Sequence, residues 1–159
     1  LGAMPYAKTF LKHALSITYT NDNLNYGVNS AIAKDLGKNK DVEQSISKAL
    51  IKKITEYKKK KRQTNTLFFT AYHEFTSKYD DYHYAFGKVS ISITAKAKNI
   101  NSKSWSINAK LIDHYDFNKF RKGSSLANDL NNNGRAAQLL GVLKTYYVYV
   151  DFTKTIKIK

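Results

Sequence analysis

The chain has 159 residues and is 42% hydrophobic, which is enough to form the core of one domain and excludes a disordered tail. The absence of cysteine excludes disulfide bonds and cysteine-ligated metal sites. The net charge of +15 favours nucleic acid, an anionic membrane surface or a phosphorylated substrate as the partner, although the same charge would also serve solubility alone.

The N-terminal part of the chain, residues 5–62, is predicted to be helical and to belong to a single domain that covers residues 5–159. Residues 1–4 contain the only methionine and are interpreted as a cloning remnant, so the start is expected to be a cut within a longer protein. Apolar residues at helical spacing predict one helix over residues 6–16 and a second over residues 24–36.

A third helix is predicted from Asp41 to about residue 59. Asp41 is expected to be its N-cap, and Gln44, three residues later, would complete a capping box. The helix ends in consecutive cations at residues 58–62, which suit the negative end of the helix dipole. The alternative is that this basic run contacts phosphates.

From Thr66 onward the hydrophobic period changes to two, which predicts a sheet within residues 64–159. The predicted elements are strands at residues 66–75, 88–98 and 105–111, a helix at 124–140, and a last strand at 143–159. The second and third of these strands are expected to form a long hairpin. This order predicts an α+β fold in which the N-terminal helices pack on a curved antiparallel sheet, an open half-barrel, with one late helix before the last strand.

A dense cluster of polar side chains follows the hairpin, namely Asp113, His114, Tyr115, Asp116 and Arg121. Acid–base or metal-assisted chemistry on an anionic substrate needs such a mixture. If the strand continues regularly, Asp113 and Tyr115 lie on its core face, whereas His114 and Asp116 lie on the opposite face. Because a buried carboxylate is costly unless it is paired, we expect either that the strand ends or bulges here or that Asp113 occupies a polar pocket. This conflict points to a functional site.

A second acidic pair, Asp80 and Asp81, precedes His83 and is expected to open the first strand of the hairpin. Residues 80–88 would then pair with residues 113–120. This pairing would bring six side chains to one end of the sheet: Asp80, Asp81, His83, Asp113, His114 and Asp116. Oxygen-rich clusters of this kind bind Mg²⁺ or Ca²⁺. The alternative is that both stretches are ordinary acidic turns of a basic protein.

At these residues the chain resembles the activity domain of colicin M-type bacteriocins and related toxin C-termini. The shared pattern is Asp-x-Tyr-Asp-Phe-Asn with an arginine shortly after it, which is found here at residues 113–118 and Arg121. A glycine and a terminal strand rich in Tyr and Ile are also similar, at Gly141 and residues 146–158. The resemblance covers approximately residues 82–159.

The resemblance implies a phosphodiesterase, usually dependent on Mg²⁺, that cleaves lipid II between undecaprenyl and the pyrophosphate and thereby stops peptidoglycan synthesis. It makes Asp113 the essential carboxylate. It assigns supporting roles to Tyr115, Asp116 and Arg121. The family usually has a histidine directly before the arginine, after a longer spacer. Phe120 holds that place here, so His114 and His83 are the candidates to substitute for the histidine.

The resemblance also implies a secreted toxin that acts on a lipid-linked substrate at the periplasmic face of the inner membrane, with an immunity protein and with delivery domains or secretion machinery.

Two alternatives remain open, a nuclease toxin and a non-enzymatic module that binds membrane or nucleic acid. Exposed aromatic side chains beside Lys or Arg on one sheet face would favour nucleic acid. A deep groove that ends at Asp113 would favour the lipid phosphodiesterase.

Overall fold

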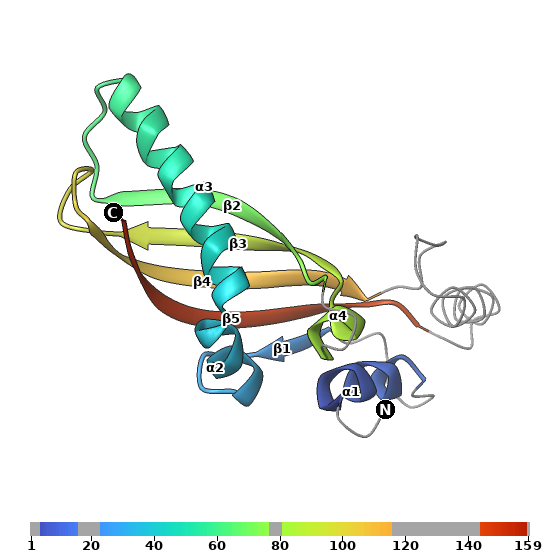
Figure 1. Ribbon diagram of the computed structural model, residues 1–159. Coiled ribbons are helices and arrows are strands. Elements are labelled where there is room, and N and C mark those ends of the chain that lie inside the picture. The colour runs from blue at the N-terminus through green and yellow to red at the C-terminus, as the bar shows by residue number, and fades with distance from the viewer. Residues whose placement is uncertain (1–3, 16–22, 77–80, 116–143, 159) are drawn as a thin grey trace.

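The computed structural model describes residues 4–15, 23–76, 81–115 and 144–158, and it has helices packed on a five-stranded sheet (Figure 1). The elements are α1 (Pro5–Ala14), β1 (Leu24–Tyr26), α2 (Ala31–Lys38), α3 (Lys40–Lys59), β2 (Thr66–Glu74), α4 (Asp81–Ala85), β3 (Lys88–Lys96), β4 (Ser104–Tyr115) and β5 (Tyr146–Lys157). The predicted α+β class is therefore confirmed. The predicted late helix at residues 124–140 lies outside the described residues.

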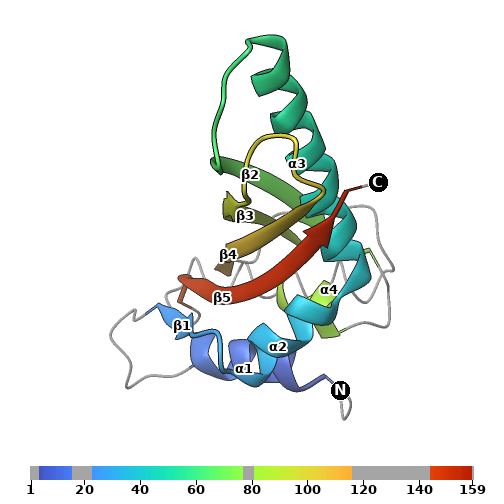
Figure 2. The same ribbon diagram turned by 90° about the vertical axis from the view of Figure 1, so that its left-hand side faces the viewer.

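The sheet has the strand order β1-β5-β4-β3-β2. Strands β2 to β5 are antiparallel to their neighbours, as the hydrophobic pattern predicts, but β1 pairs with β5 in parallel. The sheet is thus mixed rather than purely antiparallel. Its strands curve, and β1 and β2 lie at opposite edges, so the sheet remains open (Figure 2).

One face of the sheet and the apolar stripe of α3 form most of the core. Along β3 and β4 every second side chain is buried, and Trp105 is fully buried while its indole N–H donates to the carbonyl of Ser102 at 2.9 Å. The buried side chains of α3 recur every four residues, at Val42, Ile46, Leu50 and Ile54. Each contributes about 1.5–3 kcal/mol by leaving water, so this stripe anchors α3 on the sheet. No helix of the described residues is long and apolar enough to cross a membrane.

The prediction of a helix over residues 24–36 is wrong in its first half. Residues 24–26 form β1, because they pair with Val148–Val150 of β5, a tertiary contact that local spacing does not encode. The helix begins only after Ser30, whose hydroxyl oxygen accepts the amide of Ala33 at 3.3 Å. The part of the chain expected to be purely helical therefore also contributes an edge strand.

The third helix begins two residues earlier than the capping-box pattern predicts. Its N-cap is Asn39, whose Oδ1 accepts the amides of Asp41 and Val42, both at 3.0 Å. Asp41 instead lies in the first turn, where its charge suits the positive end of the helix dipole. The side chains of Asn39 and Asp41 can both cap a helix, so the sequence allows two starts. The helix uses the first, at Asn39, whose backbone is extended.

The C-terminus of α3 forms a Schellman motif with a lysine at the position that usually holds glycine. The amide of Arg62 donates to the carbonyl of Tyr57, and the amide of Lys61 donates to that of Lys58, both at 3.0 Å. Lys61 adopts φ +52°, in the left-handed region. The guanidinium of Arg62 lies 5.9 Å from the ring centroid of Tyr57. This cation–π contact takes the place of the hydrophobic contact that often accompanies a Schellman motif. The basic run thus ends the helix, as predicted.

His73 joins β2 to α3 inside the core. Its Nδ1 and the hydroxyl of Ser45 are 2.8 Å apart, its ring packs edge-on to Phe75, and no hydrogen-bond partner is found for Nε2 among the described residues. Burial lowers the pKa of His73, against the weaker opposing effects of the Asp41 and Glu74 charges. The imidazole therefore favours its neutral form in the folded protein.

Candidate functional site

Asp113 lies on the core face near the end of β4, and it is 7% exposed. The strand continues regularly past it, with Asp113 opposite Val148 and Tyr115 opposite Tyr146 of β5. The strand-parity prediction is therefore confirmed for Asp113 and Tyr115, and the alternative of a strand that ends or bulges before Asp113 is wrong. A carboxylate held this deeply needs polar surroundings.

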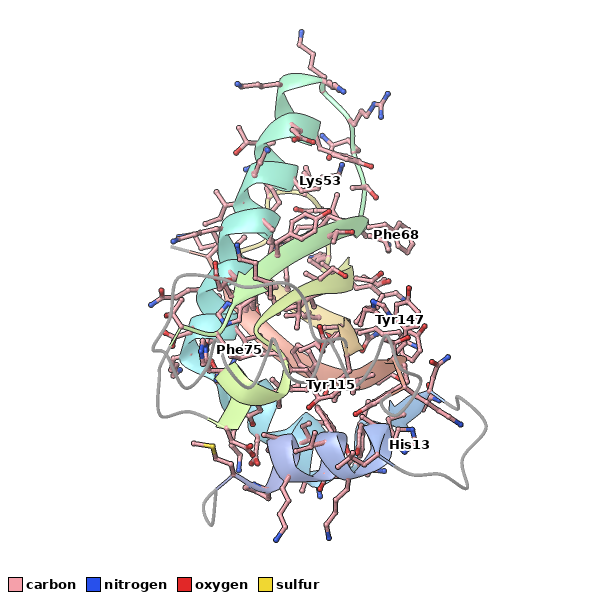
Figure 3. The ribbon with its side chains drawn as sticks, turned by 90° about the vertical axis from the view of Figure 1, so that its right-hand side faces the viewer. His13, Lys53, Phe68, Phe75, Tyr115 and Tyr147 are labelled. Carbon is pink, nitrogen blue, oxygen red and sulfur yellow. The ribbon has the colours of Figure 1, made fainter. Side chains whose placement is uncertain are left out.

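Tyr115 and Tyr146 form an aromatic cluster with Phe10 of α1, and Figure 3 labels Tyr115 in this part of the molecule. The rings of Tyr115 and Tyr146 stack at 5.1 Å, the ring of Phe10 meets Tyr115 edge-on, and the Tyr146 hydroxyl donates to the Phe10 carbonyl at 2.6 Å. Burial, and then the Asp113 charge, raise the pKa of Tyr115 to about 12. Burial also raises the pKa of Tyr146, with smaller contributions from Tyr115, Tyr26 and Asp113. Both phenols therefore stay protonated at neutral pH and remain hydrogen-bond donors.

Tyr146 is not among the site residues predicted from the sequence, although two signals point to it. It lies on the same strand face as Val148 and Val150, so parity alone places it in the core. Its position at the start of the last strand also places it beside the end of β4 in an antiparallel pair.

His114 lies on the other face of β4 from Asp113, as strand parity predicts. Its ring stacks on Tyr147 at 4.7 Å, Tyr147 stacks on Tyr149 at 5.9 Å, and the ammonium of Lys110 lies 5.9 Å from the Tyr149 centroid. Aromatic rings beside a lysine on one sheet face are the feature that would favour the nucleic-acid alternative. However, these rings stack on one another and on Lys110 rather than standing free as a platform for bases.

Asp81 serves the start of α1 rather than the end of β4. Its two carboxylate oxygens accept the amides of Tyr6, at 2.7 Å, and of Ala7, at 2.8 Å. Pro5 at the first helical position has no N–H, and the amide of Lys8 donates to the Met4 carbonyl, so Asp81 completes the capping of α1. This carboxylate also places its charge at the positive end of the helix dipole.

The expected pairing of residues 80–88 with residues 113–120 is wrong. Residues 81–85 form α4, and Gly87, at φ +62°, leads into β3, which pairs with β4 only from Ser90 opposite Ile112 onward. His83 lies on α4, and its Nδ1 is 2.5 Å from the Phe75 carbonyl oxygen. The hairpin therefore does not extend to these residues, because the left-handed turn at Gly87 follows a short helix.

Among the described residues, no three His, Asp or Glu side chains are close enough together to hold a metal ion. Mg²⁺ requires several oxygen ligands in near-octahedral geometry, and Asp81 already accepts two amides. The described residues therefore do not form a site for the expected ion, and Mg²⁺ or Ca²⁺ stays a prediction. Asp80, Asp116 and Arg121 lie outside the described residues, and a groove that ends at Asp113 stays a prediction.

No family model and no curated protein matches this chain. Among solved structures, it is similar to PaeM, a colicin M-like bacteriocin produced by Pseudomonas aeruginosa, with 18% sequence identity and a TM-score of 0.35. The match covers 60% of this chain and 35% of that chain, so this chain spans about a third of the protein that it matches. This is a distant structural likeness, and no residue role is transferred from it.

Proposed function

We propose that this chain is the activity domain of an antibacterial toxin, a phosphodiesterase that cleaves lipid II between undecaprenyl and the pyrophosphate. The observation that carries the proposal is the placement of Asp113. Its carboxylate is buried near the end of β4, next to two protonated phenols and directly before the remainder of the Asp-x-Tyr-Asp-Phe-Asn sequence. A buried carboxylate in such a place is more typical of a site than of a scaffold.

The proposed reaction is hydrolysis at phosphorus. One water molecule attacks, the bond between phosphorus and the undecaprenyl oxygen breaks, and undecaprenol and a pyrophosphorylated saccharide–peptide are released. Asp113 would orient this water and accept its proton. The hydroxyl of Tyr115, held in its neutral form, would donate a hydrogen bond to a phosphoryl oxygen. Arg121 would stabilise the charge on the leaving oxygen, and Asp116 would support the site.

The partners follow from this activity and from the charge of the chain. A net charge of +15 would hold the domain at an anionic membrane surface, where a lipid-linked substrate is found. We propose that it acts at the periplasmic face of the inner membrane after secretion and delivery by other domains or machinery. A producing cell would then need an immunity protein.

The test is a comparison of substrates with purified protein. Lipid II, RNA and DNA are each incubated with the protein in buffer with Mg²⁺, with Ca²⁺ and with a chelator. We expect release of a pyrophosphorylated product from lipid II. Degradation of RNA or DNA while lipid II stays intact would instead support the nuclease alternative, and binding of nucleic acid or membranes without any cleavage would support the non-enzymatic one.

A pair of variants tests the role of Asp113 in this reaction. Asp113→Asn removes the proton acceptor at nearly constant shape and should abolish product release while the thermal unfolding transition persists. Asp151→Asn is the matched control, because Asp151 is a partly exposed carboxylate on the neighbouring strand that pairs with Lys110 at 3.5 Å. The control should retain activity. A folded Asp113→Asn protein with full activity would show that the chemistry lies elsewhere.

A further inference from the structure

β2 is an edge strand whose outer side has no neighbouring strand in the described sheet. Two hydrogen bonds at its ends fix the direction of its backbone groups, because the Phe75 amide donates to Gly87 at 2.8 Å and the Asn65 carbonyl accepts from Ala97 at 2.9 Å. Odd-numbered residues of β2 therefore point their N–H and C=O groups toward β3, and even-numbered residues point theirs outward.

Thr66 confirms this direction. Its amide donates to the hydroxyl of Thr64 at 3.1 Å, and that hydroxyl donates to the Thr66 carbonyl at 2.8 Å, so a side chain caps both outward groups. Within the described residues, no hydrogen bond is found for the outward backbone groups of Phe68, Thr70 and Tyr72. These three residues thus offer an open edge of alternating donors and acceptors.

The side chains along this edge are aromatic and exposed. Phe68 is 68% exposed and Tyr72 is 78% exposed, the two highest values among the exposed large hydrophobic side chains of the described residues. Figure 3 shows Phe68 on the side of the sheet away from α3. An aromatic side chain that projects into water from an unpaired strand gains stability when another strand covers it.

Natural edge strands are commonly protected by shortness, proline or inward-facing charge. At the opposite edge of this sheet, β1 has three residues. β2 has nine residues and carries neither proline nor a formal charge before Glu74 at its end. An unprotected edge of this length is typical of a strand that has a partner.

We propose that β2 pairs with β2 of a second copy of this chain, antiparallel and about a two-fold axis at Thr70. This register places Thr70 opposite Thr70 and Phe68 opposite Tyr72 of the second copy. All of these residues are even-numbered, so each opposed pair can exchange two hydrogen bonds through its outward groups. The same register sets each Phe68 ring beside a Tyr72 ring, the kind of cross-strand aromatic pair that stabilises sheets. The edge is thus self-complementary.

Charge acts on this dimer in two ways. The two copies, each at +15, repel one another at long range. At the edge itself, the antiparallel register places Glu74 of one copy near the N-terminal end of β2 of the other copy, which follows Arg62. This proximity of opposite charges is locally favourable. Salt screens the long-range repulsion, whereas backbone hydrogen bonds and ring contacts are less affected. Association should therefore strengthen as salt is added.

Sedimentation equilibrium of the full chain tests the proposal, in a concentration series up to about 1 mM, at low salt and at about 0.5 M salt, where the Debye length falls to ~4 Å. The expected result is a monomer–dimer equilibrium that shifts toward dimer at the higher salt. Amide hydrogen exchange identifies which residues form the contact. Exchange at Phe68, Thr70 and Tyr72 should slow as the concentration rises, whereas that at Phe69 and Ala71, which already face β3, should not change.

Three variants test whether the β2 edge, and not another part of the surface, forms the dimer. Thr70→Pro removes an outward N–H but no bond to β3, so the fold should persist and the dimer should be lost. Phe68→Lys should also abolish the dimer. Tyr147→Lys is the matched control, since it adds the same charge at an exposed aromatic residue on β5, away from the edge, and it should still dimerise. A monomer at all concentrations in high salt, or a dimer that survives Thr70→Pro and Phe68→Lys in folded protein, would overturn the proposal.

Discussion

Replacement of Asp81 by asparagine should destabilise the protein in the absence of any metal ion. The Asp81 carboxylate accepts the two amides at the start of α1 that have no partner within the helix, at 2.7 and 2.8 Å. Asparagine has one oxygen in place of two and no charge, so it can accept only one of these amides well. The other amide is then left beside the NH₂ group of the new side chain, which cannot accept it.

The expected loss follows from the two kinds of contact that change. A hydrogen bond to a charged group contributes about 1.5–3 kcal/mol, and loss of an N-terminal cap costs about 0.5–2 kcal/mol. Because asparagine keeps one of the two bonds and Asp81 is partly exposed, we expect Asp81→Asn to lower the free energy of unfolding by about 1–2 kcal/mol. At this chain length that corresponds to a fall of roughly 2–8 °C in Tm. Asp81→Ala should cost more.

Urea unfolding followed by circular dichroism measures this loss, with Asp151→Asn as a control for a partly exposed carboxylate in a weak ion pair. The measurement is made with a chelator and again with Mg²⁺. If Asp81 caps α1, the loss is the same in both. If Asp81 instead binds a metal ion, the variant matches the parent protein in chelator and differs from it only when Mg²⁺ is present. A loss below about 0.3 kcal/mol in chelator would therefore refute the capping role.

Further predictions concern the end of α3, the buried histidine and the aromatic cluster. Lys61→Gly should raise the free energy of unfolding in urea by about 0.5–1 kcal/mol, because glycine accepts the left-handed conformation without strain, whereas Lys60→Gly should lower it. Since the pKa of His73 is lower folded than unfolded, stability should be full above about pH 6.5 and fall as the pH drops below it. His73→Phe should flatten that fall in thermal melts taken across the range. Tyr146→Phe should cost about 1 kcal/mol in urea through the lost bond to the Phe10 carbonyl.

The parts of the fold that follow a local period could be predicted from the sequence. Alternation from Lys88 onward and from Trp105 onward placed β3 and β4 and their buried faces, because a strand half-buried against helices must alternate. The stripe of α3 could be predicted for the same reason. β1 could not, because three residues carry no period, and what makes them a strand is the register with β5, more than a hundred positions away.

The predicted hairpin is too long, because the strand pattern that begins at Lys88 was extended back into residues that do not form a strand. Residues 81–87 precede a correctly predicted strand, and the sequence contains no proline there to stop it. The strand begins at Lys88 because Gly87 takes a positive φ and because Asp81 is held at α1, two constraints that act on the tertiary structure. As a result, Asp81, which was expected beside the end of β4, is displaced from the hairpin register.

Asp81 and Asp113 illustrate what separates a structural carboxylate from a candidate catalytic one. In the sequence each is an acidic residue close to a histidine and a tyrosine, and the two are indistinguishable by composition. The partners of Asp81 are backbone amides 74 and 75 positions away, which no local pattern can supply. The burial of Asp113 depends only on its parity with Trp105 and could be predicted directly. The two asparagine variants should therefore fail in different ways. Asp81→Asn should lose stability and keep its turnover once folded, whereas Asp113→Asn should lose turnover and keep its fold.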